Sequence, residues 1–413
     1  MNRLLIPAVL LSAAAAFAQS IVYEVPAKPW EVSLGSHRAV VRVEQPAEAA
    51  RVRVEWRRRD PQPEKKAVVV VDAQTGKRIA NALATGITAE SGDVAFQPVS
   101  GAGEYFVYFL PGDPGSGSFP RAKYLPPQEA SWKPGTSVEA KVVRWDARTA
   151  HDRFTEMEII ATASERDAWR AQHPEVIAAF VEPASRVVRM FDHVPQRWLL
   201  PHAAEEPEAG AGEPLVFQIG VWAARGELRT VRLRFSDLQP EGAGPAIPGA
   251  QIRCFQIGGT DVMGLPFERR VDIPAGGVLP LWCGLKASVA EPGRYVGMVE
   301  ISADGIPAQR MPFAIKVNGK GDLERAFAEP ERLAKLFWLD STIAQEDVPT
   351  RGFVPVAVEG RTIHVLGRAV TLGETGLPER ITSYFHPGVT RIVEQPTEIL
   401  AAFWETQIGR AHV

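Results

Sequence analysis

The chain has 413 residues, and its 46 Lys and Arg against 49 Asp and Glu give a net charge of −3 at pH 7. This near-neutral balance argues against a nucleic-acid-binding protein, which needs a concentrated basic face. Hydrophobic residues make up 45% and charged residues 23%, as in a globular protein, and at roughly 150 residues per domain the length predicts two to three domains. The 35 Gly and 34 Pro are typical of an all-β chain with many turns.

Residues 1–18 have the features of a secretory signal peptide. Arg3 gives a positive start, Leu4 to Ala16 form an apolar stretch, and Ala16-Phe17-Ala18 is a small-x-small cleavage site. The apolar stretch is too short to span about 30 Å of hydrocarbon, and no Cys follows the cleavage site for a lipid anchor. The sequence therefore predicts a bacterial protein that is secreted, periplasmic or on the cell surface, with no stable membrane anchor.

Residues 19–111 are expected to form an N-terminal β-sandwich. Short β-branched runs recur between Gly and Pro turns, and at 51–56 (RVRVEW) apolar and charged residues alternate as in a half-buried strand. Arg57, Arg58 and Arg59 follow this strand. They suggest an anion site, but with Asp60 next to them we interpret them as a solvated strand end.

Residues 112–210 are predicted to be a linker and connecting segment. Pro, Gly and Ser dominate 111–137, which indicates a linker or a long ordered loop. A short helix is expected to start at Ser164, with Asp167 at the third position of its first turn, and Pro174 is expected to divide it. Its apolar face is predicted to contain Trp169, Val176, Ile177, Phe180 and Val181. Residues 180–201 then read as an extended crossing segment.

A second immunoglobulin-like β-sandwich is predicted over residues 211–318. Tyr295 in the sequence PGRY is expected to act as a tyrosine corner, in which the phenol fixes a neighbouring loop, and Tyr105 is expected to close the first sandwich in the same way. Cys254 and Cys283 lie in apolar strand-like segments. The sequence leaves two alternatives for them, a disulfide or a pair of buried free thiols.

Residues 319–407 are expected to form an incomplete third β module. A short helical stretch over 323–339 precedes four strand-like runs, and no further strands are predicted as their partners. The last residues, Ile408–Val413, fit one reading frame of a common sequencing adapter. They are therefore predicted to be read-through after a gene truncated near Gln407. The predicted fold class is thus all-β, with tandem antiparallel β-sandwiches of immunoglobulin-like or jelly-roll-like type and one short helical connecting segment.

Seven segments between about Ile21 and His386 carry a family resemblance. They are VEWRRRDPQPEKKAVVVVDAQTGKRI, GEYFVYFLP, GEPLVFQIGVWAA, CFQIGGTDVMGLPFERRVDIPAGGVLPLWCGL, EPGRYVGMVEI, RLAKLFWLDSTIAQED and IHVLGRAVTLGETGLPERITSYF. Together they resemble the N-terminal, non-catalytic half of large secreted bacterial proteins related to glycoside hydrolase family 123. The resemblance implies β-sandwich modules followed by a (β/α)₈-type barrel. In that barrel an adjacent Asp-Glu pair would remove N-acetylgalactosamine by substrate-assisted catalysis.

The sequence departs from this family at the catalytic pair. No Asp-Glu dipeptide occurs in that order, and Glu346-Asp347 has it reversed. The sequence shows no alternation of strands and helices of the kind that would predict a barrel. Its scattered His residues lack metal-ligand spacing. We therefore expect no catalytic centre, metal site or cofactor in this chain, and we expect the catalytic domain to be a missing C-terminal part of the same polypeptide.

Three residues have distinctive settings as candidate contacts to a glycan or to that missing domain. Asp261 lies in GGTDVMG, and Trp338 and Asp340 lie in FWLDST. The alternative is that the two carboxylates are helix caps and turn formers, and the local sequence favours this alternative.

The leading functional hypothesis is the accessory, non-catalytic half of a secreted glycoside hydrolase acting on a polysaccharide or glycan. The alternative is a stand-alone carbohydrate-binding or cell-surface adhesion protein. Ten Trp and six Tyr are compatible with sugar stacking, although most are expected to fill sandwich cores. A purely structural envelope protein is a third hypothesis.

Overall fold

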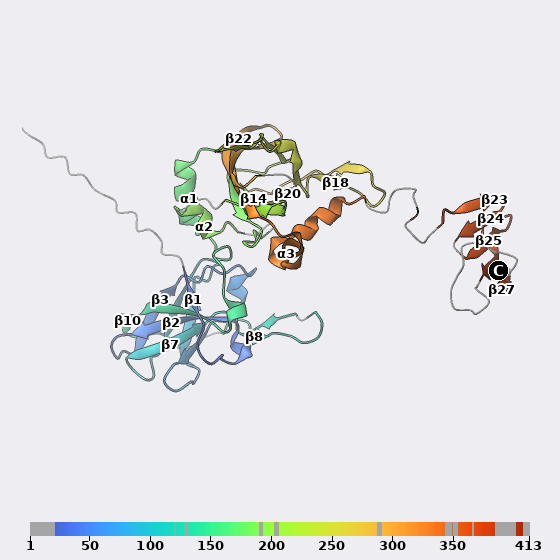
Figure 1. The fold of residues 1–413 in the computed structure, drawn as a ribbon. Coiled ribbons are helices and arrows are strands. Elements are labelled where there is room, and N and C mark those ends of the chain that lie inside the picture. Colours follow the sequence, from blue (N-terminus) through green and yellow to red (C-terminus); the bar gives the residue numbers. More distant parts are fainter. Residues whose placement is uncertain are drawn as a thin grey trace, which may run out of the picture. The chain divides into compact units, whose positions relative to one another are not determined.

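The computed structural model describes residues 21–119, 121–128, 131–189, 193–201, 206–286, 291–342, 349, 354–365, 367–384 and 402–407. The predicted signal peptide and residues 408–413 lie outside this range. The chain divides into a first compact unit, Met1–Gly258 with Glu268–Phe337, and a second, Gly259–Phe267 with Trp338–Val413. Strands dominate both units (Figure 1), and the predicted all-β class of tandem, largely antiparallel sandwiches is confirmed.

The N-terminal sandwich packs two sheets around one apolar core. Its core contains Val41 from one sheet, Val52 from the other, and the fully buried Trp56. The first sheet has the order β1 (Tyr23–Glu24), β11 (Lys141–Ala147), β2 (His37–Val43), β7 (Gly103–Tyr108) and β4 (Val69–Asp72). The second has the order β10 (Ser137–Glu139), β3 (Ala49–Val54), β6 (Gly92–Phe96) and β5 (Ala82–Thr85).

The predicted boundary of this sandwich at residue 111 is too early. After the Pro- and Gly-rich stretch, β11 pairs with the central strand β2, and β10 adds a parallel edge to β3. The stretch itself is an excursion that contains the small hairpin of β8 (Gly112–Asp113) and β9 (Lys123–Tyr124). The sandwich therefore extends to Ala147, because its edges are completed by strands that return late in the chain.

The connecting helix begins earlier than predicted. Helix α1 (Ala163–Gln172) is capped by Thr162, not Ser164. The Thr162 hydroxyl accepts a hydrogen bond from the Glu165 N–H, and the Glu165 carboxylate accepts one from the Thr162 N–H. The helix ends before Pro174, and Ile177 to Pro183 form strand β12 instead of a continued helical face.

The second sandwich runs from Ile177 to Lys320 and not from 211 to 318. Its first sheet has the order β12, β14 (Pro214–Ala223), β20 (Val278–Lys286) and β17 (Ile252–Cys254). Its second has the order β13 (Glu208–Ala211), β22 (Ile306–Lys320), β21 (Gly293–Ala303) and β15 (Arg232–Phe235), with β16 (Gln239–Pro240) paired to β21. The predicted crossing segment 180–201 thus contributes an edge strand and the helix α2 (Gln196–Leu199).

Strand β14 is buried along its whole length because it is covered on both faces. Phe217 and Ile219 point into the sandwich core, whereas Trp222 packs with Trp198 of α2 on the other face. This double burial explains why its sequence is a continuous apolar run instead of an alternating one. Gly220 is required here, since a Cβ at this position would lie 2.4 Å from the Trp198 ring.

The two predicted tyrosine corners are present. The Tyr295 hydroxyl donates to the carbonyl of Glu291 at 2.8 Å, and the Tyr105 hydroxyl donates to the carbonyl of Gly101 at 3.0 Å. Each bond reaches back four residues from the third residue of an inner strand, β7 or β21. Each sandwich therefore fixes the loop before that strand by the same device.

The C-terminal part of the chain forms a single antiparallel sheet in the residues that the structure describes. Its order is β23 (Ala357–Glu359), β24 (Thr362–Val365), β25 (Arg368–Leu372), β26 (Pro378–Tyr384) and β27 (Ala402–Gln407). The four predicted strands pair with one another, and β27 supplies a fifth that the sequence analysis missed. The expectation of strands without partners is therefore wrong.

The remaining elements are short. Helix α3 (Leu323–Ala328) follows the second sandwich, and β18 (Gly258–Thr260) pairs with β19 (Pro266–Glu268). The 3₁₀ helices are η1 (Val32–Leu34), η2 (Pro63–Lys65), η3 (Ala150–Asp152), η4 (Gly249–Gln251), η5 (Pro330–Arg332) and η6 (Ala334–Asp340).

Candidate functional site

The arginine cluster after β3 is buried and paired, which corrects its interpretation as a solvated strand end. Arg57 is 5% exposed and Arg58 is fully buried. Arg57 has a left-handed backbone, with φ 46°, and its N–H donates to the carbonyl of Glu90. This turn of the backbone directs the Arg57 side chain away from its own sheet and toward helix α1.

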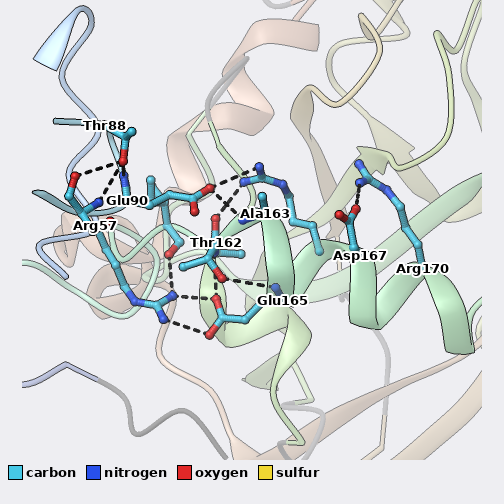
Figure 2. Close-up of polar contacts among 12 residues, drawn as sticks. Arg57, Thr88, Glu90, Thr162, Ala163, Glu165, Asp167 and Arg170 are labelled. Atoms are coloured by element: carbon cyan, nitrogen blue, oxygen red, sulfur yellow. Dashed lines mark hydrogen bonds and ion pairs between the residues drawn. The ribbon is translucent and has the colours of Figure 1, made fainter. Parts of the chain in front are cut away.

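Glu165 of α1 receives the Arg57 guanidinium in a two-point contact. Nη1 donates to Oε2 at 2.6 Å and Nη2 to Oε1 at 3.0 Å, as Figure 2 shows. The Thr162 N–H and the Gln196 side-chain amide also donate to this carboxylate. Burial alone would raise the pKa of Glu165, but these donors and the Arg57 charge hold that pKa below its usual range.

A second carboxylate joins the N-terminal sandwich to the start of the same helix. Glu90 Oε1 accepts a hydrogen bond from the Ala163 N–H at 2.7 Å, and Figure 2 labels both residues. Nη2 of Arg166 lies 3.5 Å from the same oxygen. The Ala163 N–H is one of the donors that a helix leaves unpaired at its N-terminus, where a negative charge is favourable. The N-terminal sandwich thus completes the cap of α1.

The other arginines of the cluster are neutralised in the same region. Arg58 donates to both carboxylate oxygens of Asp60, and Lys66 donates to Oδ2. Burial would raise the pKa of Asp60, but these two cations lower it below its usual range. Arg59 lies 3.7 Å from Glu158. The cluster therefore binds carboxylates of the chain itself and is not arranged as an anion site.

The C-terminal half of α1 is attached to the second sandwich. The Arg170 Nε donates to the carbonyl of Ala224 at 2.8 Å, and its guanidinium lies 5.2 Å from the Trp222 ring. Trp169 packs on Trp222 with ring centroids 5.1 Å apart, and Arg225 donates to the carbonyl of His173. Helix α1 therefore bonds to one sandwich at its first turn and to the other along its last two turns.

A cleft of about 610 Å³ lies beside α1, and we name it the α1 cleft. Its walls come from α1, β12, α2 and β22. Its aromatic lining consists of Trp169, which stacks on His173 at 4.2 Å, and Phe180, which stacks on Trp198 at 4.4 Å. Sequence analysis had assigned Trp169 and Phe180 to one helical face, whereas they come from a helix and a neighbouring strand.

Each of the three candidate contact residues has its own setting in the structure. The Asp261 Oδ1 accepts hydrogen bonds from the N–H groups of Met263 and Leu265 at 2.9 Å, so its carboxylate caps its own turn. Trp338 is 62% exposed. Asp340 ends the 3₁₀ helix η6, and its side chain lies outside the described residues.

The two cysteines face each other on adjacent strands. Cys254 of β17 and Cys283 of β20 are register partners, and the Phe255 N–H donates to the Trp282 carbonyl beside them. This pattern makes them a non-hydrogen-bonded pair, the type in which opposite side chains come closest. Both are free thiols here, and burial raises the pKa of Cys283.

Neither a metal cluster nor a membrane helix is found in the described part of the chain. The His, Cys, Asp and Glu side chains of that part form no group of three or more that could hold a metal ion. No helix among those residues is both long and apolar enough to cross a bilayer.

Comparison with known families identifies both ends of the chain. Residues 28–158 match the N-terminal domain of glycoside hydrolase family 123, and residues 356–412 match the third domain of that family. The chain is related to the N-terminal region of glycoside hydrolase family 123. No curated protein sequence matches this family 123 relative.

Three solved structures show distant likenesses to this chain. A family 123 glycoside hydrolase from Clostridium perfringens is 19% identical with a TM-score of 0.27, and the match covers 35% of this chain and 28% of that enzyme. A PapD-like domain of human CEP192 is 12% identical with a TM-score of 0.19, covering 29% of this chain and 79% of the domain. The C-terminal domain of the Streptococcus agalactiae polypeptide BspA is 6% identical with a TM-score of 0.16, covering 72% and 96%.

Proposed function

We propose that this chain is the non-catalytic N-terminal region of an exported glycoside hydrolase related to family 123. In this proposal its sandwiches form a fixed support that positions a catalytic domain elsewhere in the same polypeptide. The matches to two named domains of that family support the relation. The match to the Clostridium perfringens enzyme covers 28% of that chain.

The single observation that carries the supporting role is the double attachment of α1. Its first turn is held by Glu90 and Arg57 of the N-terminal sandwich, and Arg170 binds the second sandwich. Ion pairs with good two-point geometry and extra hydrogen bonds restrict orientation, since guanidinium and carboxylate must stay coplanar. A tandem of modules joined in this way has the stiffness that a support requires.

Sequencing the DNA around the coding region tests the proposal most simply. We expect the native reading frame to encode several hundred further residues with alternating strands and helices and an adjacent Asp-Glu pair, on the order of a (β/α)₈ barrel in length. A native gene that stops after Val413, with no such domain encoded beside it, would contradict the proposal.

An activity assay gives a second, independent test. The purified chain should not hydrolyse an aryl N-acetylgalactosaminide, because a glycosidase needs two carboxyl groups, or one with the substrate's acetamido group, held close together. Turnover that disappears in the Asp340→Asn variant would overturn the non-catalytic role. The variant Asp261→Asn serves as the matched control, since that carboxylate is engaged in its own turn.

A further inference from the structure

The α1 cleft has the size and the aromatic walls of a ligand site. Its volume of about 610 Å³ falls within the roughly 300–1,000 Å³ that small-molecule sites occupy. Trp169 and Phe180 are half-buried in its walls, and each is stacked on a second ring, His173 or Trp198, that also lines the cleft. Rings held in this way keep a fixed orientation, which lowers the entropic cost of binding against them.

Several polar side chains around these rings make no hydrogen bond to the residues that the structure describes. The amides of Gln172 and Gln309 and the indole N–H of Trp169 make no hydrogen bond within the described part of the chain. Oε2 of Glu175 is buried without a hydrogen-bond partner there, and Nδ1 of the His173 ring lies 3.8 Å from it. A buried carboxylate oxygen without a donor is unfavourable, so a ligand hydroxyl or N–H would stabilise it.

The charges around the cleft restrict the class of ligand. The arginines beside it are engaged: Arg57 binds Glu165, and Arg170 binds Asp167 and a backbone carbonyl. An anionic ligand would therefore find no uncommitted arginine among them. The groups without a hydrogen bond are instead two amides, one indole N–H and one oxygen of the Glu175 carboxylate. This mixture of donors and acceptors suits a ligand with many hydroxyl groups.

We propose that the α1 cleft is a binding site for a neutral saccharide. The apolar C–H face of a sugar ring would pack on Trp169 or Phe180, and its hydroxyls would exchange hydrogen bonds with Gln172, Gln309 and Glu175. The proposal goes beyond the supporting role, because it depends on the geometry of the cleft and not on a catalytic domain. The cleft would hold a glycan chain close to the module junction.

Binding of the full chain to an array of defined neutral oligosaccharides tests this proposal. We expect a subset of glycans to bind, and titration calorimetry of a bound oligosaccharide to show a loss of about tenfold or more in the double variant Gln172→Ala/Gln309→Ala, which removes two hydrogen-bonding amides. Both amides are at least partly exposed, so the variant should keep its urea midpoint. Gln74→Ala, an exposed change in a turn of the N-terminal sandwich, is the matched control and should bind like the parent.

Three results would overturn the assignment. The first is a blank array with a folded protein, and the second is binding that the double variant does not weaken. The third is a blank array together with binding of a quaternary amine that Glu175→Gln abolishes, since the cleft would then take a cation. None of these results bears on the α1 junction, so the supporting role is tested separately.

Discussion

The ion pair between Arg57 and Glu165 makes a measurable prediction about stability. Replacing Glu165 by Gln keeps the size of the side chain, and its amide oxygen still accepts the hydrogen bond from the Thr162 N–H. The guanidinium of Arg57 then loses its counter-charge while it remains buried. We therefore expect the free energy of unfolding of the sandwich pair to fall.

The size of the effect follows from the burial of the two side chains. Removing one partner of a fully buried ion pair costs about 3–5 kcal/mol. Here the side chains are 6% exposed for Arg57 and 18% for Glu165, and Arg57 keeps its bond to the Ile160 carbonyl. We expect a loss of about 2–3 kcal/mol for Glu165→Gln at pH 7. The loss is below that of a fully buried pair because the residual exposure and the Ile160 carbonyl still stabilise the unpaired Arg57 guanidinium.

Urea denaturation of the full chain, followed by tryptophan fluorescence, measures this loss. The matched control is Asp167→Asn on the same helix, whose side chain is 72% exposed and pairs with Arg170. It should cost at most about 0.5 kcal/mol, as exposed pairs do. A Glu165→Gln variant that loses no more stability than this control would refute the argument that the pair holds the junction.

The difference in stability between the parent and Glu165→Gln should depend on pH with a definite sign. The pKa of Glu165 is lowered in the folded protein, so the stabilisation is fully present above the unfolded pKa of about 4.3 and is lost as pH falls through the folded pKa. The gap between parent and Glu165→Gln should therefore be constant near pH 7 and should close below about pH 4. A gap that persists unchanged at pH 3 would contradict this account.

Three further predictions concern other parts of the first compact unit. Tyr295→Phe removes the corner hydrogen bond and should cost about 1 kcal/mol in urea denaturation, whereas Tyr124→Phe, an exposed ring, should cost almost nothing. Cys254 and Cys283 should form a disulfide after oxidative refolding, since their spacing as a non-hydrogen-bonded pair allows it. If both thiols are fully alkylated when the refolded protein is unfolded without reductant, the disulfide is excluded. Burial lowers the pKa of His37, so stability should decline below about pH 6.5 as the unfolded chain binds a proton that the folded chain resists. His37→Phe should flatten that decline in melting temperature, and an equal decline in both proteins would refute the assignment.

The sequence predicts the strands well because the signal for them is local. Alternation at 51–56 and the turn residues between runs depend only on neighbours, and both tyrosine corners are encoded within five residues. The boundaries of the sandwiches are not local. Strands β10 and β11 pair with strands that lie roughly a hundred residues earlier in the chain. No local pattern indicates to which sheet a returning strand belongs.

The junction was missed for a related reason. Arg57 has an acidic neighbour in Asp60, so a solvated strand end was the economical interpretation, but its partner is Glu165, 108 residues away. One signal was available. Thr162 and Glu165 form a capping-box pattern directly before an amphipathic stretch, and this pattern would have placed the start of α1 correctly.

The α1 cleft was not predicted from the sequence. Aromatic residues suited to sugar contacts were noted, but Trp169 and Phe180 were assigned to one helical face. Pro174 ends the helix, and the next residues join a sheet as β12, which brings the two rings to different walls of one cleft. Spacing along the chain does not contain that change of direction.

The central claim is that α1 holds the two sandwiches in one fixed orientation. Pulsed electron–electron double resonance spectroscopy on the full chain tests it directly. The spin labels are carried by noncanonical residues at the exposed positions Lys77 and Asn318, one in each sandwich. The account predicts a single narrow distribution of distances between the labels in the parent protein. A broad or multiple distribution in the parent would show that the sandwiches move independently, and it would contradict the claim.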